Sequence, residues 1–430
     1  MFNWLSEVSL FKGMTAKTFR DPVHDVITWK QEGEVGRLIC ALIGTPQVQR
    51  LRHIRQLGLA SYVYHGAEHS RFSHSVGVCH VSRRMCDALG VDDPLDRAAV
   101  ISAALLHDIG HAPFSHAMER VFGFDHEDYS LRLVRDTSSP VHELLTEMDG
   151  GLPERVAGLL SGDGSDWRQA IVSSQMDADR FDYLLRDAHM TGVKVGRYDL
   201  ERILLMLRHD GHGLLVDEGA FESLEGYLVA RYHMYRLVYF HRAVRAAESM
   251  LERMFARARF LLERGDGSVL VAGALGALMR GEVVDAASYV QLGDYSAWSV
   301  IAQWMEHPDP VLSRLSRGLM ERRLFRSVER RLDHGSEADD EQVARVMDEL
   351  SAQERFLFVV DEARDLPYRP YRVAESLNQA IRMVDRRGRT YPIEERSELA
   401  AALGQGAYRL RRWCFDEALR SKIRRIVGEI

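Results

Sequence analysis

The sequence predicts a mainly α-helical protein with a smaller α+β lobe at its C-terminal end. Helical patterns run from about residue 34 to 260, whereas past residue 265 short helical patterns alternate with Gly, Pro and Asp turns. A chain of 430 residues also exceeds the length at which a single hydrophobic core stops growing, so two lobes are expected. We place the helical core at 18–335 and the C-terminal lobe at 336–430.

The first predicted elements are an extended arm and two helices. Residues 18–30 alternate apolar and polar side chains around Pro22, which is typical of a short strand or extended arm. The segment 46–58 opens with Pro and closes with Gly, as helices often do. Residues 94–108 are apolar around nearly the whole helical circumference, which predicts a buried central helix that ends in His-Asp.

Further helices and a few strands follow along the chain. We expect helices within 167–190 and 219–264, which complete the helical core. Strands are expected at 355–360 and, as a hairpin, within 379–393. The most polar stretch, 336–342, is the best candidate for a linker between the two lobes.

Composition and charge exclude several classes of function. The chain has 56 Lys and Arg against 63 Asp and Glu, and a net charge of −7 gives no basic field to hold it on DNA or an anionic membrane. Nucleic acid is therefore an unlikely partner. Nearly all the basic residues are Arg, whose planar fork suits phosphate oxygens. Four scattered cysteines and no long apolar stretch argue against disulfides and membrane spans, so we expect a cytoplasmic protein.

Histidines crowd into one third of the helical region, and with nearby aspartates they predict a metal site. His107 and Asp108 end an apolar helix, where burying both is costly unless a divalent ion lies between them. His74 and Asp179, from two other helical segments, are the candidates that would complete the ligand set. Two His and two Asp leave coordination positions open for water and substrate, as a catalytic metal requires.

These residues fall into motifs that resemble a known family. The ordered set RFSH, HDIGHAPFSH and DADRFDY resembles the signature of the HD-domain metal phosphohydrolases. The longer runs TPQVQRLRHIRQLG, HSRFSHSVGV and FDYLLRDAH are similar to the deoxynucleoside triphosphate triphosphohydrolases, the branch that contains the mammalian SAM-and-HD-domain dNTPase and bacterial relatives. The resemblance covers about residues 19–260. It implies a helical HD-domain core in which water attacks the α-phosphate of a nucleotide and releases nucleoside and triphosphate.

Carried over residue by residue, the resemblance implies a role for each matching position. The ligands of a divalent metal, whether Mn, Fe, Mg or Zn, would be His74, His107, Asp108 and Asp179. The proton-handling residues would be His111, Glu119 and His126, with Glu119 where the family usually has Asp. Phosphate, sugar and base would be contacted by Gln56, Leu57, Arg71, His116, Arg180, Tyr183, Asp187, Arg231, Tyr239 and His241.

The resemblance also implies partners. A nucleotide would be the substrate, and the chain would form a homo-oligomer, a dimer or a tetramer. Relatives that a guanine nucleotide activates have an Asp immediately before the TPQ motif to bind the guanine edge. Here that residue is Gly44, so the carboxylate for a guanine-specific activator is missing.

Structural explanations remain open for several of these residues. The groups concerned are His111, Glu119 and His126; Asp182, Arg186 and Asp187; and Arg231, Tyr235 and Tyr239. The first group could cap helices or support metal ligands, and the second could be a solvated helix face with i,i+4 ion pairs. The third, spaced by four, could be a packed helix face with arginine stems along it.

Two other functions also remain open. An HD phosphohydrolase of different substrate would use the same ligands to remove phosphates stepwise from nucleotides or nucleotide analogues. A nucleotide or single-stranded nucleic-acid binding module, in which hydrolysis is incidental, is a third class. The intact metal-ligand set and the acidic net charge argue against that last class.

Overall fold

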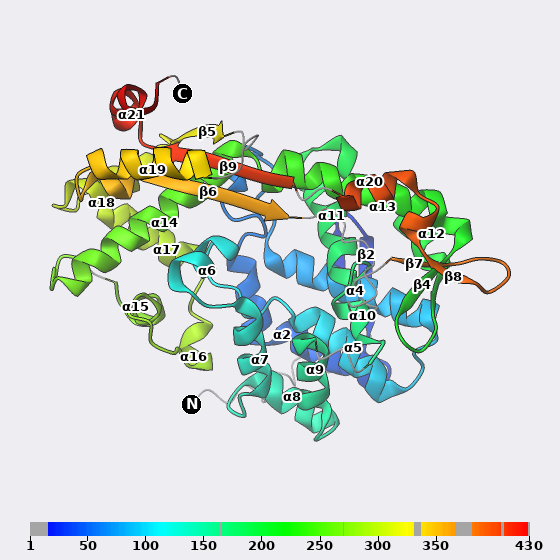
Figure 1. Ribbon diagram of the computed structural model, residues 1–430. Coiled ribbons are helices and arrows are strands. Elements are labelled where there is room, and N and C mark those ends of the chain that lie inside the picture. Colours follow the sequence, from blue (N-terminus) through cyan, green and yellow to red (C-terminus); the bar gives the residue numbers. More distant parts are fainter. Residues whose placement is uncertain are drawn as a thin grey trace.

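The computed structural model shows, over the residues it describes, a helical core with three small sheets (Figure 1). The structure describes residues 16–162, 166–269, 271–330, 337–365, 381–405 and 408–428. In these ranges no helix has both the length and the apolar character needed to cross a membrane.

Three helices form the centre of the fold: α4 (Arg71–Leu89), α5 (Pro94–Leu106) and α11 (Ala178–Thr191). Helix α4 packs against both of the others. Residues 98–106 of α5 are all buried, which confirms the predicted central helix. Asp93 caps its first turn by accepting the N–H groups of Leu95 and Asp96, and Pro94 occupies the first helical position. The helix ends at Leu106, and His107 is its C-cap residue.

The N-terminal elements differ from the prediction in two places. The expected arm is an antiparallel hairpin of β1 (Ala16–Asp21) and β2 (Asp25–Lys30). After α2 (Glu34–Gly44), the helix expected over 46–58 is wrong beyond residue 53, because α3 (Pro46–Arg50) passes into the 3-10 turn η2 (Leu51–His53) and then leaves the helical path. Arg55 instead forms a bridge with Ser70, which brings the following residues to the pocket described below.

The other elements of the core surround the central helices. They are η3 (Ala60–Tyr62), α6 (His116–Phe122), α7 (His126–Arg135), α8 (Pro140–Met148), α9 (Leu152–Ser161), α10 (Gln169–Val172), η4 (Lys194–Gly196), α12 (Leu200–Leu205), η5 (Glu218–Ala220), α13 (Phe221–Met234), η6 (Tyr235–Tyr239) and α14 (Arg242–Glu263). Element η6 is a π-helical turn, so the aromatic run predicted as helix is broken between α13 and α14. Such turns occur often at functional sites.

The later part of the chain adds several helices and completes two further sheets. Its helices and turns are α15 (Gly273–Met279), α16 (Ala286–Tyr289), α17 (Asp294–Trp304), α18 (Pro310–Met320), α19 (Glu337–Glu349), η7 (Glu354–Leu357), η9 (Ile393–Glu395), α20 (Glu398–Gln405), η10 (Glu417–Leu419) and α21 (Arg420–Val427). The linker expected at 336–342 is wrong, since most of that stretch is the first part of α19.

Both sheets join residues from either side of position 335. One sheet has the order β5-β9-β6, from β5 (Arg326–Arg330), β9 (Tyr408–Phe415) and β6 (Phe358–Asp365). The other has the order β3-β4-β7-β8, from β3 (Leu207–His209), β4 (Leu214–Asp217), β7 (Arg382–Val384) and β8 (Thr390–Pro392). The hairpin predicted within 379–393 is confirmed by β7 and β8, whereas the strand predicted at 355–360 begins only at residue 358.

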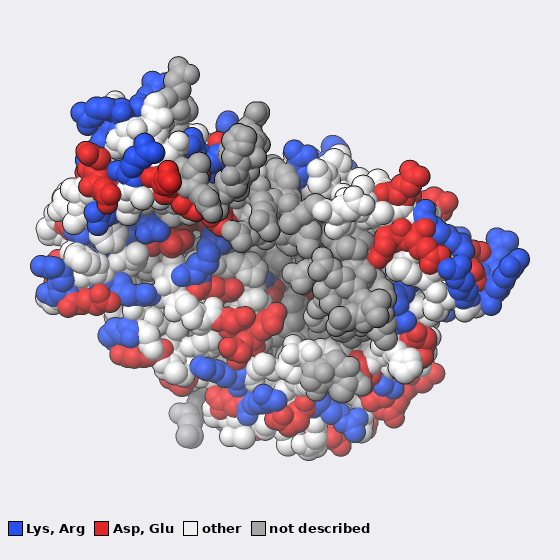
Figure 2. Space-filling model, viewed as in Figure 1, with Lys and Arg blue, Asp and Glu red and all other residues white. Residues whose placement is uncertain are grey.

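Many of the numerous arginines are paired with carboxylates on the surface. On the visible face, basic and acidic side chains are interspersed, and a group of basic residues stands at the β7–β8 end (Figure 2). Even there, Arg389 pairs with Glu395 at 2.5 Å and Arg386 lies 3.4 Å from Glu218. Exposed pairs of this kind contribute little to stability. The arginines that bear on function must therefore be sought inside the molecule.

Candidate metal centre and active-site pocket

The four predicted metal ligands converge from three segments of the chain. Helix α4 supplies His74, the turn after α5 supplies His107 and Asp108, and α11 supplies Asp179. The Nε2 atom of His74 lies 3.0 Å from Asp179 Oδ1 and 3.8 Å from Asp108 Oδ2. The Nε2 atom of His107 lies 3.3 Å from Asp108 Oδ1 and 3.6 Å from Asp179 Oδ1. Two imidazole nitrogens and two carboxylates thus face one common point.

Hydrogen bonds on the far side of each ring aim the Nε2 atoms at that point. The Nδ1 atom of His107 lies 2.8 Å from the carbonyl oxygen of Ala104, and that of His74 lies 2.8 Å from Asp182 Oδ2. A carbonyl or a carboxylate oxygen only accepts, so each Nδ1 carries the proton and, in a neutral ring, Nε2 keeps its lone pair. The Nε2 atom of His107 is buried and has no hydrogen-bond partner among the described residues. The donor set therefore fits a divalent cation.

The electrostatics of the site also favour a positive charge at its centre. Burial opposes the charged form of His74, yet hydrogen bonds with Asp179 and Asp182 raise its pKa to about 10, so a bound cation would replace the proton that Nε2 otherwise shares with Asp179. Burial opposes the charged form of Asp108 as well, but Arg71 and the neighbouring histidines hold the pKa of that carboxyl well below its usual range. Because the two carboxylates stay ionised, they attract a cation.

Behind His74, a buried network of charges holds Asp182 in place. Arg186 donates two hydrogen bonds of 2.8 Å to Asp182, and its third nitrogen donates to Asp21 at 2.8 Å. The ring of His24 lies 2.7 Å from the other Asp182 oxygen. Gly77 makes room for this network, since a Cβ there would lie 1.9 Å from Asp182. The alternative that Asp182, Arg186 and Asp187 form a solvated helix face is wrong, because all three are buried.

A second cluster of histidines lies on the other side of Asp108. The Nδ1 atoms of His111 and His126 each lie 3.0 Å from Glu119 Oε1, and that of His116 lies 3.1 Å from Oε2. The rings of His111 and His126 stack with their centres 3.7 Å apart. The Nε2 atom of His111 contacts Asp108 Oδ1 at 3.2 Å, so the cluster adjoins the metal ligands. Burial, with Arg71 and His126 nearby, lowers the pKa of His111 to about 3.

A strained turn brings this cluster to the pocket. Phe114 and Ser115 both have positive φ, at 57° and 56°. A non-glycine residue in this region costs about 1–3 kcal/mol and persists where its surroundings fix it. Here the Phe114 N–H donates to Asp294 at 2.8 Å, and the Ser115 hydroxyl donates to the Arg55 carbonyl at 3.0 Å. The turn places His116 at the edge of the pocket, with its side chain 64% exposed.

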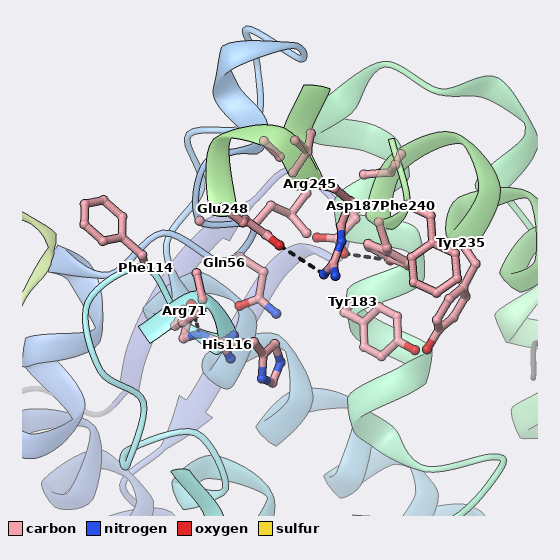
Figure 3. A pocket seen from close by; sticks show the side chains of 18 of the residues that line it. Gln56, Arg71, Phe114, His116, Tyr183, Asp187, Tyr235, Phe240, Arg245 and Glu248 are labelled. Carbon is pink, nitrogen blue, oxygen red and sulfur yellow. Dashed lines mark hydrogen bonds and ion pairs between the residues drawn. The ribbon is translucent and has the colours of Figure 1, made fainter. Parts of the chain in front are cut away.

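The pocket is a cavity of about 390 Å³ beside the metal ligands. Its walls come from the 56–60 turn, the start of α6, helix α11, element η6 and the start of α14 (Figure 3). Asp179 also lines it, so the candidate metal centre opens into this cavity. Arg71 reaches the pocket as well; its Nη1 donates to Asp108 Oδ2 at 2.5 Å and its Nε donates to the Ser115 hydroxyl at 2.8 Å.

Comparison with known proteins identifies the family. Residues 71–187 match the HD domain, and residues 198–266 match the HD-associated region. Protein YwfO of Bacillus subtilis is 35% identical over 393 residues, which span 90% of this chain and 89% of that protein. The chain belongs to the HD-domain phosphohydrolases.

Two other relatives carry functional names. The deoxynucleoside triphosphate triphosphohydrolase SAMHD1 of Homo sapiens is 29% identical over 325 residues, which span 65% of this chain but only 50% of that protein. A crystal structure of a phosphohydrolase from Bacteroides thetaiotaomicron superposes with a TM-score of 0.78 at 27% identity, covering 94% of this chain and all of that one. The structural similarity of this HD-domain phosphohydrolase to a known structure therefore covers much more of the chain than the two matched regions.

The structure brings most of the predicted substrate-contacting residues of this HD-domain phosphohydrolase to the pocket. Those that line it are Gln56, Leu57, Arg71, His116, Arg180, Tyr183, Asp187 and Tyr239. Arg231 and His241 are not among the lining residues. Arg231 is buried and donates to the Gln175 side chain at 2.6 Å, and His241 caps the first turn of α14. Arg180 donates to the Ser174 carbonyl at 2.6 Å and pairs with Asp177.

Two features of the HD-domain phosphohydrolase pocket were not predicted from the sequence. His69 is buried and its Nε2 lies 2.8 Å from Asp187 Oδ1, while the Tyr239 hydroxyl donates to Oδ2 at 2.8 Å. Arg245 and Glu248 also line the pocket, on the first turns of α14. Their i,i+3 spacing was visible in the sequence, but no motif distinguished it from an ordinary surface pair.

Proposed function

We propose that this HD-domain phosphohydrolase hydrolyses (deoxy)nucleoside triphosphates, with attack of water at the α-phosphate and release of nucleoside and triphosphate. The observation that carries the proposal is that Asp179, which faces His74 and His107, lines a pocket that also contains Arg71 and Arg180. Polyphosphate brings concentrated negative charge, which guanidinium groups bind well. The name of the human relative supports a deoxynucleotide substrate.

The residues around the cluster bind and orient the phosphates. A divalent ion held there supplies Lewis acidity toward a phosphoryl oxygen and makes water a better nucleophile near neutral pH. Arg71 is held by Asp108 and Ser115, so its guanidinium is already oriented before the phosphate arrives. Tyr183 lines the pocket, as Arg180 does, and contacts His74 edge to face, so its ring adjoins the candidate metal ligands and is available to contact the nucleotide.

The second histidine cluster would manage the proton that the leaving nucleoside oxygen needs. Of the three rings around Glu119, only that of His116 lines the pocket. Glu119 binds its Nδ1, which leaves Nε2 as the nitrogen that exchanges a proton with the substrate. The stacked rings of His111 and His126 lie against the Glu119 carboxylate and would hold it beside His116. Asp187, fixed by His69 and Tyr239, presents a carboxylate to a sugar hydroxyl.

Product analysis tests the proposal. Protein reconstituted with Mn²⁺, Mg²⁺, Zn²⁺ or Fe²⁺ is incubated with each of the four dNTPs singly and with all four together, and the products are separated by ion-exchange chromatography. Nucleoside with intact triphosphate supports the proposal. Orthophosphate with successive di- and monophosphates would instead establish stepwise removal of phosphates, and absence of any hydrolysis would leave a binding module.

Two accompanying expectations concern partners. Activity seen only in the dNTP mixture would show that a nucleotide activator binds even though position 44 is Gly. A dimer or tetramer is also proposed, and light scattering coupled to size exclusion measures it directly.

A further inference from the structure

One wall of the pocket carries three charged side chains that are not among the residues proposed to bind phosphate. Arg120, Arg245 and Glu248 all line the cavity. In Figure 3, Arg245 and Glu248 lie on one side of Gln56, whereas Arg71 and His116 lie on the other. If the phosphates bind beside the candidate metal ligands, the base at the other end of the nucleotide would face this wall.

These side chains are fixed before a ligand binds. The Nε atom of Arg245 donates to Asp361 Oδ2 at 3.1 Å, and its Nη2 donates to the other oxygen of the same carboxylate. Asp361 is buried on strand β6 of the C-terminal sheet. The remaining nitrogen, Nη1, donates to Glu248 Oε2 at 3.2 Å. A guanidinium held in this way loses little conformational entropy on binding.

Glu248 is bonded to two guanidinium groups. Arg120 Nη2 donates to Glu248 Oε2 at 2.9 Å, the same oxygen that Arg245 contacts. Among the described residues, every recorded contact of the Glu248 carboxylate uses Oε2, so Oε1 keeps its lone pairs for a ligand. The wall thus offers a donor, an acceptor and a second donor from three neighbouring side chains.

We infer that Arg120, Glu248 and Arg245 read the edge of the base and favour thymine or uracil. This inference rests on the proposed function, because it assumes that the pocket holds a nucleotide. Thymine and uracil present acceptor, donor and acceptor as O4, N3–H and O2, which complements the donor–acceptor–donor wall at all three positions. Cytosine presents its N3 lone pair where N3–H would be, and this lone pair repels the carboxylate. Guanine presents two adjacent donors, N1–H and N2–H, of which only one can meet the carboxylate.

The sharpest probe is the pair dUTP and dCTP, which are alike in size and sugar and differ only in the base edge. Binding of each to the protein without added metal is measured by isothermal titration calorimetry, so the readout does not depend on hydrolysis. We expect dUTP to bind about tenfold or more tightly than dCTP, the discrimination that a well-formed base contact provides. Glu248→Gln offers an amide that accepts from N3–H or donates to N3, so its dUTP/dCTP ratio should fall to near one.

The matched control is Glu252→Gln, one turn further along α14, where the carboxylate approaches Arg120 only at 4.0 Å and does not line the pocket. This variant should keep the ratio of the unchanged protein, and a thermal melt of both variants confirms folding. Equal binding of dUTP and dCTP, or an unchanged ratio in Glu248→Gln, would overturn the base-reading inference while the proposed function stands. Discrimination without hydrolysis of any dNTP in metal-loaded protein would refute the proposed function alone. No binding of either nucleotide would overturn the base-reading inference, and the product analysis with metal-loaded protein would decide the proposed function separately.

Discussion

Two clusters of histidine and carboxylate side chains meet at Asp108, and they use the same residue types to opposite effect. In the first, the Nδ1–H groups of His74 and His107 donate hydrogen bonds to Asp182 and to the Ala104 carbonyl, and their Nε2 atoms face the candidate metal position. In the second, His111, His116 and His126 turn Nδ1 toward the single carboxylate of Glu119. The first arrangement converges lone pairs on one point and suits a cation. The second surrounds one acid with rings and suits exchange of a proton.

The pKa values of the two rings beside Asp108 also differ. Nearby carboxylates raise the pKa of His74 to about 10 against the effect of burial, whereas burial, aided by Arg71, lowers the pKa of His111 to about 3. Asp108 touches both rings, at 3.8 and 3.2 Å. Both rings have carboxylates beside both nitrogens, so the difference comes from burial together with the positive charges of Arg71 and His126 next to His111, which oppose its protonation.

The largest effect is expected from loss of a metal ligand. Replacing His107 with Ala removes a buried lone pair from the centre, so bound metal should fall and hydrolysis should drop about 10³-fold or more, since Lewis-acid stabilisation is worth several kcal/mol. Metal content by plasma mass spectrometry and kcat by product release measure both. His142→Ala is the control, because its Nδ1 also contacts a backbone carbonyl, at 3.0 Å, but outside either cluster. Full metal content in His107→Ala would contradict the assignment of ligands.

A substitution in the second cluster should lower activity without lowering the metal content. Glu119→Gln removes the charge that three histidines share, and we expect kcat to fall about 10²- to 10⁴-fold, the usual worth of acid–base catalysis, while metal content stays unchanged. Glu119→Asp is the matched variant; it keeps the carboxylate and should retain much more activity than Gln. Loss of metal in Glu119→Gln would mean that the two clusters form one site rather than two.

The convergence of the candidate metal ligands was predictable from the sequence because the signal is local. Charged residues at the end of a helix that is apolar all round, such as His107 and Asp108 after α5, are costly to bury without compensation, and the structure shows them converging with His74 and Asp179. The helical core was predictable for a similar reason, since periodicity is read within one segment.

Features that depend on distant segments were not predictable. Asp182 and Arg186 have the i,i+4 spacing of an ordinary surface pair, and only the arrival of Asp21 and the space left by Gly77 bury them. The helix predicted over 46–58 ends early because Arg55 bridges to Ser70, a contact that periodicity cannot show. Likewise, Arg245 is fixed by Asp361, 116 residues further along the chain.

Loss of Asp182, which supports His74 from behind, should have a smaller effect than loss of a metal ligand. Asp182→Asn removes the charge that accepts the Nδ1 proton of His74, so metal affinity should weaken about 10- to 100-fold. Arg186, buried and left with Asp21 as its remaining carboxylate, should make the variant less stable by a few kcal/mol. Metal titration and urea unfolding measure the two effects. Asp87→Asn, which alters an exposed ion pair of α4 with Arg97, should change neither.

The smallest effect compares two histidines on the same helix. Burial, with His24 and Arg83 nearby, lowers the pKa of His80 to about 4, the opposite of His74 one and a half turns away. Because the folded state resists a proton that the unfolded chain accepts at its ordinary pKa of about 6.5, the stability from His80 is complete above pH 6.5 and is lost as pH falls toward 4. The loss is at most about 1.4 kcal/mol per pH unit.

His80→Gln tests this expectation, because the amide can still accept the hydrogen bond that Arg83 Nη2 gives to His80 Nδ1 at 3.2 Å but does not titrate. Urea unfolding at pH 7, 6 and 5 should show a shallower decline of stability in His80→Gln than in the unchanged protein. Identical slopes would mean that His80 takes up its proton equally in both states. In that case the difference in pKa between buried histidines would be confined to the two clusters that share Asp108. The raised pKa of His74 would then be attributed to its contacts with Asp179 and Asp182.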